Sequence, residues 1–198
     1  MSVEKDEVLR ELFKISKRVG ERGWAPGSSG NISVRIPGKS LIYIKVTGKN
    51  MLDLTPSDIL TLDMDGNIVE GVGKPSKEVR FHLGIYRVRG DVGAVIHSHP
   101  PYASAYAIIG IPIPLKTAPG KYVLKRIPEV EFAPRGSKEL AEGVIKAFQD
   151  PQVKAVTLKG HGIVAVGATL QEAYNITEWV EDAAREAFLT SLLAKGLE

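Results

Sequence analysis

Histidine is the residue of this chain with the clearest potential for chemistry. The 198-residue sequence has no cysteine and four histidines, at positions 82, 97, 99 and 161. His97 and His99 lie two residues apart in a predicted strand, where alternate side chains point to the same face, so both imidazoles can reach one ion. His161, from a separate segment, would add a third neutral nitrogen. Three protein ligands leave coordination positions open, which is typical of a catalytic metal site.

The neighbouring residues in the sequence predict different roles for His161 and His82. Gly160 and Gly162 flank His161 and should let the backbone turn sharply and approach a ligand closely. His82 instead falls on one face of a predicted helix together with apolar residues. We therefore interpret His82 as a hydrogen-bonded core histidine and not as a fourth ligand.

Several short segments of small or polar residues could bind an anion. Two are turns whose backbone N–H groups could surround a phosphate, and a third lies at a predicted helix start, where the helix dipole favours negative charge. Taken alone, each segment is better explained as an ordinary turn or helix cap. The residues are Gly30, Asn31, Thr47, Gly48, Ser76 and Lys77.

Glu78 lies in the same predicted first helical turn as Ser76. It could be an exposed glutamate that complements the helix dipole. It could also be a carboxylate above the metal, placed to remove a proton from a substrate and return it. The spacing of the residues does not decide between these interpretations.

The composition excludes several classes of protein. Without cysteine there can be no disulfide, thiolate nucleophile or cysteine-bound zinc. The net charge is only +3 and the basic residues are scattered, so we expect no nucleic-acid partner. The N-terminal segment is charged from residue 4, unlike a signal peptide, and no apolar run is long enough to span a membrane. We expect a cytoplasmic protein with no membrane association.

Periodicity predicts one α+β domain over residues 1–198, with an antiparallel or mixed sheet and helices packed on it in layers. Helices are expected over 5–19, from 75 onward, and over 101–109, 137–148 and 169 to near the C-terminus. Strands are expected over 32–35, 41–46, 59–63, 68–70, 93–99, 130–132, 153–158 and 163–166. Residues 110–136, rich in proline, are expected to form a long ordered loop.

Taken in order, the motifs of the chain resemble the class II aldolase/adducin family. The resemblance spans almost the whole chain and implies an α/β (α+β layered) fold, a three-layer α/β/α sandwich with a central, mainly antiparallel sheet. It also implies a homotetramer with active sites near the subunit interfaces. The matching segments are Gly30-Asn31-Ile32-Ser33, Val46-Thr47-Gly48, Lys74-Pro75-Ser76-Lys77-Glu78, Phe81-His82, Ala94-Val95-Ile96-His97-Ser98-His99 and Gly160-His161-Gly162.

The resemblance further implies an enzyme of carbohydrate metabolism, a class II (zinc-dependent) aldehyde-lyase. Such an aldolase reversibly cleaves a phosphorylated ketose, such as L-fuculose 1-phosphate, to dihydroxyacetone phosphate and an aldehyde through a metal-stabilised enediolate. Zn²⁺, or else Mn²⁺ or Co²⁺, would be held by His97, His99 and His161. Glu78 would be the acid/base and could also approach the metal. The substrate phosphate would bind Gly30, Asn31, Thr47, Gly48, Ser76 and Lys77.

Three departures from the aldolase pattern keep other reactions open. Lys77 stands where the fuculose-phosphate aldolase has a second serine, and this version is similar to the branch that decarboxylates 3-oxo sugar-acid phosphates. Ala118 stands where the aldolase has a catalytic tyrosine supplied by a neighbouring subunit, although Tyr122 is close in sequence. The C-terminus also lacks the aldolase's tyrosine-bearing tail. A sugar-phosphate epimerase or dehydratase, and a non-enzymatic module like the adducin head, are the remaining alternatives; the adducin head lacks the three histidines.

Overall fold

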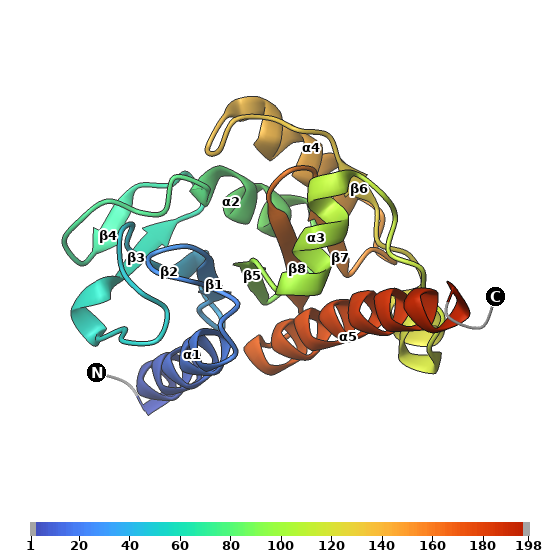
Figure 1. Ribbon diagram of the computed structural model, residues 1–198. Coiled ribbons are helices and arrows are strands. Elements are labelled where there is room, and N and C mark those ends of the chain that lie inside the picture. Colours follow the sequence, from blue (N-terminus) through green and yellow to red (C-terminus); the bar gives the residue numbers. More distant parts are fainter. Residues whose placement is uncertain (1–2, 196–198) are drawn as a thin grey trace.

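A computed structural model describes residues 3–195, and its central feature is one eight-stranded sheet (Figure 1). The spatial order of the strands is β4-β3-β2-β1-β5-β8-β7-β6. Every neighbouring pair is antiparallel except β6 and β7, which are parallel. The strands are β1 (Asn31–Arg35), β2 (Leu41–Lys45), β3 (Ile59–Asp63), β4 (Ile68–Glu70), β5 (Ala94–Ser98), β6 (Glu129–Val130), β7 (Ala155–Leu158) and β8 (Gly162–Gly167).

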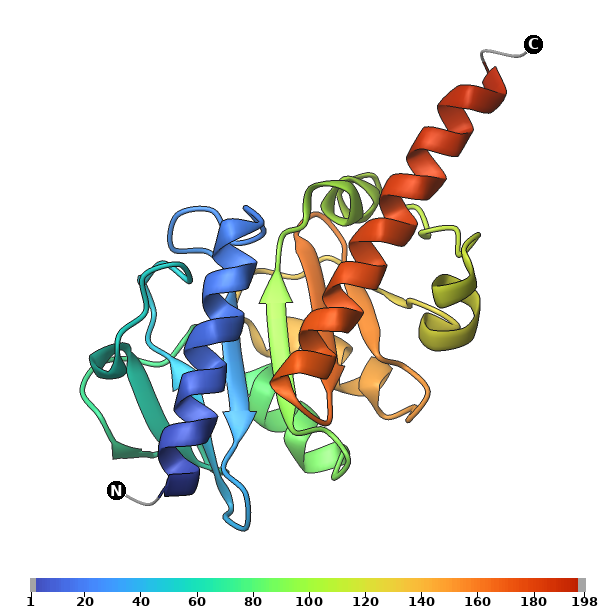
Figure 2. The same ribbon diagram turned by 90° about the horizontal axis from the view of Figure 1, so that it is seen from below.

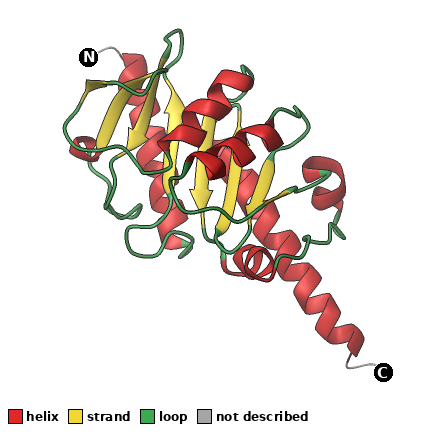
Figure 3. Cartoon of the chain, turned by 90° about the horizontal axis from the view of Figure 1, so that it is seen from above, coloured by secondary structure: helices red, strands yellow, loops and turns green. Residues whose placement is uncertain are grey.

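Helices cover both faces of this sheet. Figure 2 shows α1 and α5 lying across one face, with α3 beside α5, and Figure 3 shows α2 and α4 on the opposite face. The prediction of three layers around a mainly antiparallel sheet is therefore confirmed. The helices are α1 (Val3–Glu21), α2 (Val79–Val88), α3 (Pro101–Ile109), α4 (Lys138–Phe148) and α5 (Leu170–Lys195), with a short 3₁₀ turn at Pro56–Asp58.

Alternation along the strands divides the core into two sides. In β2, Ile42 and Ile44 pack toward α2 and α4, whereas Tyr43 packs toward α1. In β8, Val164 faces the first side and Ile163 the second. Strand β5 lies between β1 and β8 and all five of its residues are buried. The central strands therefore form the rigid interior on which the site is built.

One predicted element begins later than expected. The helix expected from Pro75 starts at Val79, and residues 75–78 form an extended segment followed by a turn. The prediction failed because Pro75 pairs with Val46 in an isolated β-bridge and the N–H of Thr47 donates to the carbonyl of Lys74 at 2.9 Å. These tertiary contacts hold the segment extended, a conformation that the helix-start pattern does not reveal.

The loop over residues 110–136 contains more structure than expected. It includes a five-residue π-helical turn at Gly120–Leu124 before it reaches β6. Ser137 caps α4 as predicted, since its side chain accepts a hydrogen bond from the N–H of Leu140 at 3.1 Å.

Among residues 3–195, none of the helices is both long enough and apolar enough to span a membrane.

Candidate metal centre

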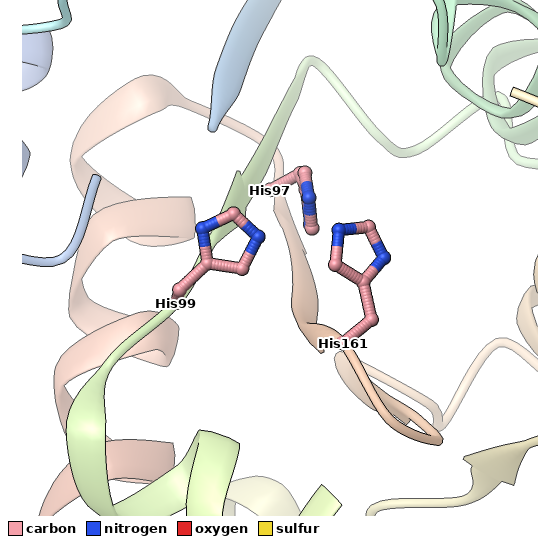
Figure 4. Close-up of side chains that lie close together, drawn as sticks. All are labelled: His97, His99 and His161. Carbon is pink, nitrogen blue, oxygen red and sulfur yellow. The ribbon is translucent and has the colours of Figure 1, made fainter. Parts of the chain in front are cut away.

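Three histidines converge at one end of the central strands (Figure 4). His97 is in β5, His99 follows the end of β5, and His161 precedes β8. The ring centroid of His97 lies 4.7 Å from those of both His99 and His161, and the latter two are 5.1 Å apart. One ligand atom from each residue lies within 4.8 Å of the other two. The structure thus confirms the convergence predicted from the His-x-His spacing and the Gly-His-Gly turn.

The two glycines beside His161 have distinct roles. Gly160 adopts a positive φ of 70° in a four-residue turn closed by a hydrogen bond of 2.9 Å from the N–H of His161 to the carbonyl of Leu158. Gly162 lies against the end of β5, where an added Cβ would be 2.5 Å from His99 Cδ2 and 2.6 Å from the Ser98 oxygen. A larger residue at 162 would push the two ligand-bearing segments apart.

The hydrogen bonding of His97 presents a lone pair to the cluster. Its Nδ1 lies 2.9 Å from the backbone oxygen of Ile163, and because a carbonyl only accepts, Nδ1 must carry the hydrogen. When His97 binds a metal, the lone pair is therefore supplied by the other nitrogen, Nε2. Nε2 is buried and has no hydrogen-bond partner among the described residues. An unpartnered, buried imidazole nitrogen aimed at two other histidines fits a metal ligand.

The surroundings of the other two histidines favour neutral rings. Burial lowers the pKa of His99 to about 3 and that of His161 to about 4, with the neighbouring histidines acting in the same direction. The Nδ1 of His99 lies 3.2 Å from the hydroxyl of Ser29, which can fix the ring. Neutral imidazoles with oriented rings are the form in which histidine binds a divalent ion, so the residues present fit such a group.

Glu78 lies directly beside the histidines and its side chain is fully buried. Its Oε2 accepts a hydrogen bond of 2.7 Å from Asn31 Nδ2 and lies 3.4 Å from His97 Nε2. Its Oε1 lies 3.8 Å from His161 Nε2 and 3.7 Å from Arg135 Nε. The exposed-glutamate interpretation is therefore wrong, and the carboxylate faces the cluster.

Opposing effects act on the ionisation of Glu78. Burial favours the neutral acid, but the electrostatic interactions with His97, His161 and Arg135 and the Asn31 hydrogen bond outweigh it and hold the pKa of Glu78 below its ordinary value. We therefore treat the group as a carboxylate at neutral pH.

The segments predicted to bind phosphate come together near Glu78. The Val46–Pro75 bridge sets the Thr47-Gly48 turn beside Ser76, whose hydroxyl accepts a hydrogen bond of 3.3 Å from the N–H of Glu78. Gly48 has a positive φ of 79°. Thr47 and Lys77 are exposed, whereas Ser76 is buried. Four of the six residues thus lie on two segments that this bridge joins just before Glu78.

The other two predicted phosphate residues lie deeper. Gly30 packs tightly against the strand that carries His97, because a Cβ on it would lie 3.0 Å from the His97 oxygen. Asn31 is fully buried, and its side chain bonds Glu78 and His82. His82 is also fully buried and hydrogen-bonded, which confirms it as a core histidine.

Sequence reasoning missed Arg135 and the role of Ser29. Arg135 lies in the loop before α4, which packs closely on the Glu78 turn, since a Cβ at Gly136 would lie 2.9 Å from the Lys77 oxygen. Its guanidinium is half exposed, beside the buried carboxylate. The residue is 57 positions from Glu78 in an irregular segment, and no spacing rule links the two.

Comparison with known proteins shows which family has this fold and this cluster of histidines. Residues 10–188 match the model of the class II aldolase and adducin N-terminal domain. The chain belongs to this family. It is 37% identical over 185 residues to an L-fuculose phosphate aldolase of Methanococcus maripaludis, covering 93% of this chain and 98% of that protein. A solved L-fuculose 1-phosphate aldolase superposes with a TM-score of 0.87 at 35% identity, covering 98% of this chain and 89% of the other.

Membership of this family does not by itself fix the reaction. A 3-oxo-tetronate 4-phosphate decarboxylase of Escherichia coli is 34% identical over 190 residues, covering 93% of this chain and 88% of that protein. Aldolases and a decarboxylase are thus similar to this chain at comparable identity. The family establishes a sugar-phosphate enzyme with a three-histidine site that can hold a metal.

The position of the missing tyrosine is open to solvent. Ala118 is exposed, and Tyr122, in the π-helical turn, has 78% of its surface exposed. Neither residue contributes to the histidine cluster of the same chain.

Proposed function

We propose that this protein is a metal-dependent lyase that reversibly cleaves a phosphorylated ketose, such as L-fuculose 1-phosphate, to dihydroxyacetone phosphate and an aldehyde. One observation carries the proposal: the buried carboxylate of Glu78 faces three converging imidazoles, one of which has an unpartnered nitrogen. A general base beside a Lewis-acid site suits proton transfer next to a carbonyl group.

Each residue has a defined part in this reaction. His97, His99 and His161 would hold Zn²⁺, Mn²⁺ or Co²⁺, which would stabilise negative charge developing on the substrate oxygens. Glu78 removes a proton at one carboxylate oxygen while Asn31 holds the other. The phosphate binds the N–H of Gly48 and the side chains of Thr47 and Lys77, because the N–H of Thr47 already donates to the carbonyl of Lys74. That binding fixes the substrate far from the reacting carbons.

Decarboxylation of a 3-oxo sugar-acid phosphate is the second candidate, and Arg135 favours it. A half-exposed guanidinium beside the cluster is suited to binding a substrate carboxylate with two hydrogen bonds. Lys77 is an additional cation at the same entrance. A ketose phosphate offers only one anionic group, whereas an oxo-acid phosphate offers two.

Metal content and product analysis test the proposal together. Protein purified without chelators should contain one divalent ion per chain. Absence of any such ion, with no rescue by added zinc, manganese or cobalt, would favour the adducin-like interaction module. The substrate test combines dihydroxyacetone phosphate with a panel of aldehydes, beside a panel of 3-oxo acid phosphates. Release of carbon dioxide without any condensation product would assign the decarboxylase reaction instead.

Substitution of the base separates chemistry from metal binding. Glu78→Gln keeps the shape and the Asn31 contact but removes the proton acceptor. We expect it to retain the metal and lose at least about 100-fold in kcat, since general-base catalysis contributes that much or more. Unchanged turnover would remove Glu78 from the reaction.

A further inference from the structure

Behind Glu78, a single line of hydrogen bonds runs into the core between α2 and β1. Asn31 Nδ2 donates to Glu78, and Asn31 Oδ1 contacts His82 Nε2. His82 Nδ1 lies 2.7 Å from Ser33 Oγ, which lies 2.8 Å from the hydroxyl of Tyr86. The line alternates between helix and strand, because Glu78, His82 and Tyr86 follow the four-residue helical spacing while Asn31 and Ser33 follow the two-residue strand spacing.

The chemistry of these groups permits one direction for the hydrogens. A carboxylate only accepts, so the amide nitrogen of Asn31 faces Glu78 and its oxygen faces His82. The Nε2 of His82 must then donate, which leaves Nδ1 to accept from Ser33. Ser33 has one hydrogen, so it accepts from Tyr86. Every donor in the line thus points toward Glu78.

The surroundings keep these groups in that state. Asn31, Ser33 and His82 have no exposed surface, and Tyr86 has 2%. Burial lowers the pKa of His82 to about 3, so its ring is neutral, and burial raises the pKa of Tyr86, so its hydroxyl keeps its hydrogen. The guanidinium of Arg35 lies 4.8 Å from the centre of the Tyr86 ring and makes the hydroxyl a stronger donor.

We propose that Asn31, His82, Ser33 and Tyr86 form a one-directional hydrogen-bond relay that positions the Glu78 side chain as a proton acceptor. His82 and Tyr86 are positioning residues, since they act only through Asn31. A line of bonds with the same direction polarises each member, and it holds Oε2 of Glu78 beside His97 while Oε1 lies toward His161. The catalytic part of this inference rests on the proposed function, whereas the direction of the bonds does not.

The direction is tested by nitrogen NMR of the imidazoles, which needs no activity. Four histidines give a resolvable spectrum, and the signals of His82 are those lost in His82→Gln. Protein labelled with ¹⁵N-histidine is measured as purified and again with zinc added. We expect His82 as a fixed neutral ring protonated at Nε2 from pH 6 to 8, and a shift of its Nδ1 resonance in Tyr86→Phe. A ring protonated at Nδ1, a charged ring, or averaging between tautomers would overturn the relay.

Kinetics of Tyr86→Phe test the effect on Glu78, and Tyr174→Phe is a matched control. Tyr174 is 1% exposed, donates to Glu178 at 3.1 Å and has the Arg18 guanidinium 3.9 Å from its ring centre. It stacks on Trp24, and its described hydrogen-bond partners are not members of the relay. For Tyr86→Phe we expect kcat to fall about threefold to tenfold, the effect of one weakened hydrogen bond, at unchanged KM and metal content. Equal kcat in both variants would contradict the positioning role.

A second pair of variants separates the relay from simple packing. In His82→Gln the amide can still donate to Asn31 and accept from Ser33, so kcat should stay within about threefold of wild type. In His82→Leu the line is cut, and kcat should fall by at least about tenfold more than in His82→Gln at comparable KM. Equal loss in both, in step with loss of thermal stability, would show that residue 82 serves only the core. If wild-type protein cleaves no substrate, the proposed function fails, and the NMR measurement still decides the direction of the bonds.

Discussion

Glu78 shows how opposing effects at one residue can give a base that is both buried and ionised. Burial alone would protonate it. Arg135 on one side and the Asn31 amide on the other favour the charge without occupying the face that points to His97. A carboxylate that is desolvated in this way is a stronger base than one in water, and its fixed orientation keeps it directed at the substrate.

Replacement of Arg135 distinguishes the two candidate substrates. Arg135→Ala should lower kcat/KM for a 3-oxo acid phosphate about tenfold more than for a ketose phosphate, which is about 1.4 kcal/mol of transition-state binding. Arg10→Ala, an exposed arginine remote in α1, removes the same charge as a control. If both substrates are affected equally, Arg135 does not bind a substrate carboxylate.

The protonation of His82 makes a specific contribution to pH-dependent stability. The pKa of His82 is about 3 in the folded protein, against an ordinary value of 6.5. Below pH 6.5, His82 therefore binds a proton in the unfolded chain but stays unprotonated in the folded protein. Stability is full above pH 6.5 and falls as the pH drops, by up to about 1.4 kcal/mol per pH unit from this group.

Urea unfolding of metal-free protein between pH 7 and 5 measures this contribution. His82→Gln lacks the titrating group but keeps the others. Its unfolding free energy should therefore approach that of wild type as the pH falls. A difference between the two proteins that does not change with pH would mean that His82 binds a proton as readily in the folded protein as in the unfolded chain.

At the residue level, the sequence predicts the features that depend only on the local geometry of one strand or one helix. The shared face of His97 and His99 follows from strand alternation, and the core position of His82 follows from its helix face. The sequence does not predict which residues these side chains contact in the folded protein. Asn31 meets Glu78 across 47 positions only because β1 and α2 pack together, and Arg135 arrives from an irregular loop. Such contacts depend on tertiary packing, which spacing rules do not contain.

Three adjacent strands supply most of the site. β1 carries Asn31 and Ser33, β5 carries His97 and leads to His99, and β8 follows His161. The antiparallel register sets Asn31 opposite His97, and Ser98 opposite Ile163. Ladder hydrogen bonds therefore fix the spacing of the ligands. This gives the precision that metal sites on strands have over sites on loops.

Gly162→Ala tests the closeness of β5 and β8. Its new Cβ would collide with His99 and Ser98, so we expect a loss of about 1–3 kcal/mol in unfolding free energy together with weaker metal binding. Gly90→Ala is the control, because a Cβ there meets nothing within 4 Å. Denaturant unfolding and metal titration of both variants measure the effect. Wild-type metal affinity in Gly162→Ala would show that the strands can separate without moving the ligands.

At the scale of the whole molecule, the second half of α5 extends beyond the body of the protein (Figure 2). Large apolar residues are exposed there: Phe188, Leu189, Leu192 and Leu193. Isolated chains rarely keep such a stripe in water. The homotetramer proposed from the family would bury it, and would also bring the exposed 118–122 segment of one copy toward the site of another.

Charges on this stripe should disrupt the assembly. We expect wild-type protein to sediment as four chains, and the double variant Leu189→Glu with Leu193→Glu to sediment as smaller species. Ser191→Glu adds a charge on a different face of the same helix turns and should leave the assembly intact. Sedimentation of the three proteins gives the result. An unchanged mass in the double variant would place the interface elsewhere.

The division between the central strands and the peripheral loops has a consequence for how such enzymes diversify. The metal ligands and the relay behind Glu78 come from the sheet and α2, whereas Arg135 and the 118–122 segment come from loops that join peripheral elements. Insertions or exchanges in those loops can alter which sugar is accepted while the proton chemistry stays intact. Libraries confined to residues 111–136 should therefore yield new specificities more often than libraries in the strands.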